Sequence, residues 1–181
     1  EDIKLSQVDD IMFFRPPCQS VFISKTDTEP CPMQAPPLGV EGVDPVVAVF
    51  DGMPIQNHPL LRGRIIVDDP DDYATNYESK YRIHGTSMTS LAIYGDLNRN
   101  DLPITSPVYV RPILRPKQVG LDSIQECVPD DKLFVDTLHR AVKRMMEGEN
   151  GEDATAPNTK VINLSVGDPV RQLSTIMSPI A

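Results

Sequence analysis

The feature that most constrains the fold is an unbroken run of five apolar residues, 46–50, which ends on Asp51 and Gly52. A short apolar run rich in β-branched residues is typical of a strand that a parallel sheet buries on both faces. A sheet interior does not accommodate an unpaired carboxylate, so we expect Asp51 at the carboxyl end of its strand. Ligands bind at that end of the strands in open α/β sheets, which makes Asp51 a candidate functional carboxylate.

Later apolar segments alternate between strand and helix patterns along the chain. Strands are predicted at residues 64–67, 108–114 and 160–164, and helices from His84 to a stop at Gly95 and from residue 130 or 131 onward. Such alternation predicts an α/β fold, with a mostly parallel sheet, right-handed crossovers and helices on both faces.

Each predicted helix has an apolar stripe at helical spacing. In the first helix this stripe is formed by Met88, Leu91 and Ala92, and His84 lies at the amino end, off the stripe. In the second helix the stripe is formed by Phe134, Leu138, Ala141, Val142 and Met145.

Residues 1–43 differ from the rest of the 181-residue chain and are predicted to be a proline-rich, irregular leader. Six prolines fall between residues 16 and 37, and each fixes φ and removes a backbone donor. A short edge strand is expected at residues 21–23. Residues 44–181 are then predicted to form one α/β unit.

Overall charge limits the classes of partner. The net charge is −9 and the isoelectric point is near 4.7, which argues against nucleic acid or an anionic membrane as the partner. No apolar run approaches the roughly 20 residues of a membrane span. The odd number of cysteines (Cys18, Cys31 and Cys127), with no CxxC or Cys/His cluster, indicates neither a zinc site nor a disulfide framework. A Cys18–Cys31 bridge stays open, and this cysteine usage leans towards a reducing, cytoplasmic location.

The most acidic stretch, Asp-Asp-Pro-Asp-Asp at residues 68–72, reads as a solvated turn. Calcium held by its carboxylate oxygens is the alternative, but the alternating ligand spacing of an EF-hand is absent. No cofactor or metal is therefore predicted.

Three motifs occur in an order that resembles one enzyme family. Residues 47–51 followed by His58 and Pro59 resemble the aspartate motif of the subtilisin-like serine proteases (subtilases), in which a His-Pro pair follows the catalytic Asp by seven residues. The His-Gly-Thr of residues 84–86 resembles the histidine motif of that family at the start of a helix. Val-Ile-Asn-Leu-Ser-Val-Gly at residues 161–167 is similar to its substrate-binding strand. Together the motifs cover about residues 46–169.

The resemblance implies a role for each matching residue. Asp51 would accept a hydrogen bond from one imidazole nitrogen of His84, and His84 would act as general base and then general acid. Ser165, Val166 and Gly167 would pair with the extended backbone of a peptide or protein substrate. His58 would be a structural turn residue without a catalytic role.

The chain also departs from the family pattern. Met53 stands where the family usually carries glycine, and Leu60 stands where many members have an aspartate that helps to bind calcium. The serine motif and the oxyanion asparagine of the family lie beyond the substrate strand, and this sequence ends at Ala181 before either. We therefore expect an incomplete subtilisin-like unit that lacks its nucleophile and is inactive by itself, with an exposed sheet edge that favours self-association.

Ser87 lies in a Gly-Thr-Ser-Met sequence that spells part of the serine motif of the family. It follows His84 by three residues on the same helical turn, where its side chain points to a different face, so Ser87 is expected to cap or pack.

Two other functions compete with the protease. An apolar strand that ends on Asp51 is also similar to haloacid-dehalogenase-type phosphatases, but these carry a second aspartate where this chain has Met53. The second alternative is a non-catalytic, subtilase-like module that binds or regulates through residues 165–167.

Overall fold

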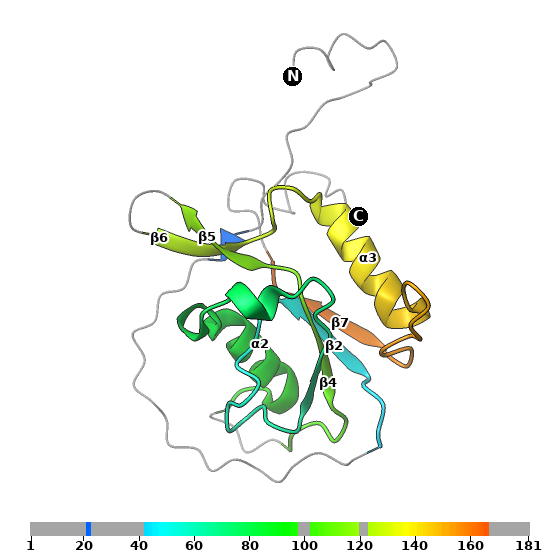
Figure 1. Cartoon of the computed structure of the whole chain (residues 1–181). Coiled ribbons are helices and arrows are strands. Elements are labelled where there is room, and N and C mark those ends of the chain that lie inside the picture. Colours follow the sequence, from blue (N-terminus) through cyan, green and yellow to red (C-terminus); the bar gives the residue numbers. More distant parts are fainter. Residues whose placement is uncertain (1–20, 23–41, 98–101, 120–122, 167–181) are drawn as a thin grey trace, which may run out of the picture.

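Two small sheets and two α-helices make up the described part of the computed structural model, which comprises residues 21–22, 42–97, 102–119 and 123–166 (Figure 1). The leader predicted at residues 1–43, apart from residues 21–22 and 42–43, lies outside these ranges, as do Cys18, Cys31 and Gly167. Within the described residues, Cys127 is a free, buried cysteine. No described helix is both long and apolar enough to cross a membrane.

The larger sheet is four-stranded and entirely parallel. Its strand order is β3 (Ile65–Val67), β4 (Val108–Pro112), β2 (Val47–Asp51) and β7 (Val161–Leu164). Every side chain of β4 is buried, as the apolar pattern of a central parallel strand predicts. Each strand of this sheet thus lies at a predicted position, although the strand predicted at residues 108–114 ends at Pro112.

A helix covers each face of this sheet (Figure 1). On one face, α2 (Ile83–Tyr94) packs Ile93 and Tyr94 against Val49 and its neighbours on β4. On the other face, α3 (Phe134–Glu147) packs against Ala48 and Phe50. Alternate residues of β2 therefore lie in different hydrophobic cores, one on each face of the sheet, because successive side chains of a strand point to opposite faces. The prediction of a mixed α/β fold with a mostly parallel sheet and helices on both faces is confirmed.

The apolar stripe predicted for α3 is confirmed, whereas the stripe predicted for α2 is confirmed at Met88 and Ala92 but wrong at Leu91. Leu91 is 47% exposed, whereas Thr89 and Ser90 are buried. The helix can bury the threonine because its hydroxyl donates to the Gly85 carbonyl, at 2.6 Å. The side of α2 that faces the sheet is therefore rich in small and hydroxyl-bearing residues.

A smaller antiparallel sheet flanks the first and was not predicted beyond its shortest strand. Its order is β1 (Val21–Phe22), β6 (Ser123–Cys127) and β5 (Arg115–Val119). The strand expected at residues 21–23 is confirmed for its first two residues. Two 3-10 helices, η1 (Tyr73–Asn76) and η2 (Ser79–Tyr81), lead into α2.

The acidic turn after β3 forms ion pairs and is not a solvated loop. Asp71 binds Arg111 and Arg140, both at 2.7 Å, and Asp68 binds Arg144 at 2.9 Å. The side chains of Asp68 and Asp71 are only 9% and 15% exposed. Cationic side chains thus occupy these carboxylates, and no cluster of three or more potential metal ligands occurs in the described ranges.

Candidate functional site

The carboxyl end of β2 buries a carboxylate, as the sequence predicts. Asp51 is completely buried, and its backbone carbonyl accepts a hydrogen bond from Ile113 N at 2.7 Å, which fixes the strand end against the residue after β4. Its side-chain Oδ1 accepts a hydrogen bond from Gly52 N at 2.6 Å. The carboxylate is therefore held at the sheet edge where open α/β sheets bind ligands.

His84, the second residue of α2, lies against that carboxylate although 33 residues separate the two in sequence. Its Nδ1 is 2.7 Å from Asp51 Oδ1, and only 6% of the residue is exposed. A carboxylate at Nδ1 favours the tautomer with the hydrogen on Nδ1 and leaves Nε2 with a lone pair. An imidazole oriented in this way can accept and return a proton through Nε2.

Hydrogen bonds to loop backbone fix the start of α2 and thus His84. Thr86 Oγ1 donates to Arg82 O at 2.5 Å and accepts from Ile55 N at 2.9 Å, which joins the helix to the loop after β2. The Arg82 guanidinium donates to the carbonyls of Tyr77 and Ala74 at 2.7 and 2.9 Å. Both loops that flank the site are therefore tied to the first turn of the helix.

Gly85 lets α2 approach β2 closely enough for the Asp51–His84 contact. A Cβ at position 85 would collide with the carbonyl group of Gly52. Only glycine therefore fits at this point of contact between the helix and the strand exit.

We expect Gly85→Ala to destabilise the protein by about 1–3 kcal/mol, because the added methyl group overpacks a backbone contact. Helix propensity alone predicts the opposite sign, since Ala is better than Gly in a helix interior by roughly 1 kcal/mol. Urea unfolding measures the difference, and Ser87→Ala on the exposed side of the same helix is the matched control. An unchanged or higher unfolding free energy for Gly85→Ala would contradict the close contact.

The predicted substrate segment leaves the sheet beside Asp51. Phe50 and Leu164 are register partners, so Asp51 and Ser165 follow them at the same edge. Ser165 Oγ is 2.9 Å from Asn163 Oδ1, and Val166 packs against the core on the α3 face. Gly167, the third predicted residue, lies outside the described residues.

The remaining polar candidates lie apart from the pair or bond elsewhere. Ser87 is exposed, and its hydroxyl donates to Ile83 O at 2.8 Å. His58 lies in the turn after β2, where its Nδ1 accepts from Leu60 N at 3.3 Å, and His139 is exposed on α3. His58 thus lies in a turn, as expected, and Ser87 binds helix backbone on the exposed side and does not pack.

Sequence reasoning missed Glu126 and Tyr77, which lie beside the pair. A Cβ on Gly52 would collide with Glu126 Oε1 and lie 2.5 Å from Tyr77 Oη, so both oxygens lie against the residue that follows Asp51. Glu126 is 6% exposed and Tyr77 is 2% exposed. Burial, followed by repulsion from the negative charge of Asp51, raises the pKa of Glu126 to about 8. No motif marks either residue, and the position of Glu126 depends on a hairpin that the sequence does not predict.

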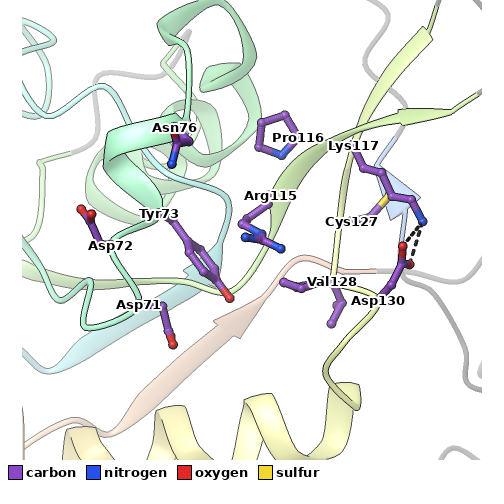
Figure 2. Close-up of a pocket in the computed structure, with 11 residues that line it drawn as sticks. Asp71, Asp72, Tyr73, Asn76, Arg115, Pro116, Lys117, Cys127, Val128 and Asp130 are labelled. Carbon is purple, nitrogen blue, oxygen red and sulfur yellow. Dashed lines mark hydrogen bonds and ion pairs between the residues drawn. The ribbon is translucent and has the colours of Figure 1, made fainter.

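A separate cavity of about 420 Å³ opens between η1 and the β5–β6 hairpin (Figure 2). Neither Asp51 nor His84 lines it. Lys117 and Asp130 form an ion pair within it at 2.6 Å, and the Arg115 guanidinium lies 5.2 Å from the centre of the Tyr73 ring. Asp71, which also lines the cavity, pairs with Arg111 and Arg140 outside it. The cavity therefore does not extend the site built around Asp51 and His84.

Comparison of the chain with protein-family models, with curated proteins and with solved structures gives no match.

Proposed function

We propose that this chain forms the amino-terminal part of the catalytic domain of a subtilisin-like serine endopeptidase. The observation that carries the proposal is the buried 2.7 Å contact between Asp51 Oδ1 and His84 Nδ1 at the carboxyl edge of the parallel sheet. In an Asp-His-Ser triad the aspartate accepts a hydrogen bond from Nδ1 of the histidine. Asp51 and His84 have the arrangement of these two members of a triad.

Each residue has a defined part in the proposed reaction. His84 takes the proton of a serine hydroxyl through Nε2 as the serine attacks the scissile carbonyl, and then returns the proton to the leaving amine. Asp51 holds the tautomer and stabilises the imidazolium that forms. The nucleophilic serine belongs to a part of the protein outside these 181 residues, so the chain alone forms no acyl-enzyme.

The edge of β7 supports an extended peptide as the substrate. Among the described strands β7 pairs only with β2, and its Val161 and Ile162 are 57% and 39% exposed. An open strand edge can pair with substrate backbone, through Ser165 and Val166 in this proposal, or with a second copy of the chain.

The geometry favours this proposal over a phosphatase. A nucleophilic aspartate needs a carboxylate oxygen that can attack phosphorus, whereas Asp51 Oδ1 already binds Gly52 N and His84 Nδ1, and Oδ2 is buried. The alternative function is a non-catalytic peptide-binding module. Labelling with a fluorophosphonate probe distinguishes this module from a protease.

We expect a fluorophosphonate probe to label the full-length protein on a serine outside residues 1–181. The probe reacts with a serine activated by a histidine base, so His84→Gln should lower the labelling rate by about 10³-fold or more. His139→Gln, at an exposed histidine of α3, is the matched control and should label at the wild-type rate. If the wild-type protein is not labelled, the protease proposal is overturned in favour of the binding module.

A further inference from the structure

We propose that Glu126 is a positioning residue for the Asp51–His84 pair: as a neutral carboxylic acid it supplies a hydrogen-bond donor to the buried Asp51 carboxylate and keeps that carboxylate in the orientation that holds His84. This inference rests on the proposed protease function and assigns a residue outside the three motifs to the same site.

The small sheet places Glu126 at this point. Glu126 lies on β6, opposite Pro116 of β5 and Phe22 of β1, so both neighbouring strands fix its backbone. Its Oε1 occupies the space that any side chain at position 52 would fill. The glycine after Asp51 therefore leaves room for a second carboxyl group against the residue that follows the first.

The balance of donors and acceptors at this point requires a proton on Glu126. Asp51 Oδ1 has two partners, Gly52 N and His84 Nδ1, but the buried Oδ2 has none. Glu126 Oε1 and Tyr77 Oη are also buried without a partner. An ionised Glu126 would add a further acceptor, whereas a protonated one can donate, so the acid form supplies the kind of group that the unpartnered Oδ2 of Asp51 lacks.

Electrostatics favours the same form. Two buried carboxylates side by side would carry two negative charges in a medium that solvates neither well. The raised pKa of Glu126, about 8, means that most of this group carries its proton at neutral pH. The site then holds one negative charge, on Asp51, which faces the positive charge that His84 acquires during catalysis.

A fixed Asp51 matters because catalysis depends on the direction of the His84 ring. Rotation of the carboxylate would move Oδ1 away from Nδ1 and release the ring. Misplacement of a catalytic group by about 1 Å can cost roughly 100-fold in rate. Glu126 is therefore expected to act on kcat through Asp51 and to have little effect on the KM of a peptide.

Two variants of the full-length protein separate this role from mere space filling. Glu126→Met keeps an unbranched side chain of similar length but has no donor of comparable strength, and its kcat for a peptide substrate is expected to fall by roughly 10–100-fold, with KM changed less than about threefold. Glu126→Gln is neutral and can donate through its amide, and it should restore kcat to within about fivefold of wild type. Thermal unfolding of both variants reports whether they fold.

Tyr77→Phe is a second variant, at the hydroxyl that lies with Glu126 Oε1 against Gly52. It leaves the ring unchanged, and kcat is expected to fall by at most about fivefold, because one hydrogen bond contributes about 1 kcal/mol. Wild-type kcat in a folded Glu126→Met variant overturns the role of Glu126. If that variant is unfolded, a difference in unfolding free energy between wild type and Glu126→Gln that stays constant with pH overturns it instead, because Glu126 would then not carry the proton that it donates.

The two proposals fail in different ways. A wild-type protein that neither reacts with the fluorophosphonate probe nor hydrolyses peptides fails as a protease, and the role of Glu126 fails with it. An active wild-type protein whose Glu126→Met variant is equally active remains a protease, and only the positioning role is lost.

Discussion

Replacement of Asp51 by Asn is expected to lower the kcat of the full-length protein by about 10⁴-fold, because loss of this carboxylate selects the wrong histidine tautomer. The carboxylate only accepts hydrogen bonds, so it requires a hydrogen on His84 Nδ1, at 2.7 Å. An asparagine amide can also donate, and it then favours the tautomer whose Nδ1 lacks a hydrogen and whose Nε2 cannot act as a base. Peptide hydrolysis under saturating substrate measures the change, with KM expected to stay nearly constant.

The size of the effect distinguishes catalysis from folding. Asp153→Asn, an equally conservative change at an exposed aspartate, is the matched control and should keep wild-type kcat. Circular dichroism and thermal unfolding of Asp51→Asn report whether the sheet edge is intact. A folded Asp51→Asn variant with more than about a tenth of wild-type kcat is incompatible with the role given to Asp51. A triad whose aspartate is replaced in this way loses orders of magnitude in kcat.

The larger sheet could be predicted from sequence because its buried strands appear there as unbroken apolar runs. The segments that form β2 and β4 are apolar on both faces, and only a parallel sheet covered on both sides explains such runs. The stripe of α3 is likewise visible because its apolar side chains recur at helical spacing and pack against the core. In these elements local pattern and tertiary environment agree, and the predicted order of elements is correct.

The β5–β6 hairpin could not be predicted because its stability comes from the rest of the fold. The strand residues Arg115, Lys117, Gln125 and Glu126 are polar or charged, and Pro116 lies within β5, so no alternation of apolar residues marks either strand. The position of Glu126 beside Gly52 depends on this hairpin. A buried carboxyl group beside the site is thus visible only in three dimensions.

The buried face of α2 was mispredicted in part, for a related reason. The apolar pattern selected Leu91 along with Met88 and Ala92, but the helix approaches the exit of β2 closely at Gly85, and it buries Thr89 and leaves Leu91 exposed. The position of His84 at the start of the helix follows correctly from its motif. Its contact with Asp51 was an expectation of the family resemblance, and the 2.7 Å geometry agrees with that expectation.

Stability should depend on pH through Glu126, and this second prediction requires no enzymatic activity. The pKa of Glu126 is raised from an ordinary value of 4.5 to about 8 in the folded protein. The folded state therefore binds a proton that the unfolded state releases between these two values. Stability from this group is complete below about pH 4.5 and decreases as pH rises towards 8, by up to about 1.4 kcal/mol per pH unit.

Glu126→Gln isolates this contribution because glutamine cannot ionise. Urea unfolding of both proteins at half-unit steps from pH 5 to 8.5 should show the wild-type protein losing stability relative to the variant as pH rises, with the slope flattening above about pH 8. The other groups near this carboxyl are present in both proteins, so their contributions largely cancel in the difference. If the difference between the two proteins does not change with pH, Glu126 is not held in its acid form by folding.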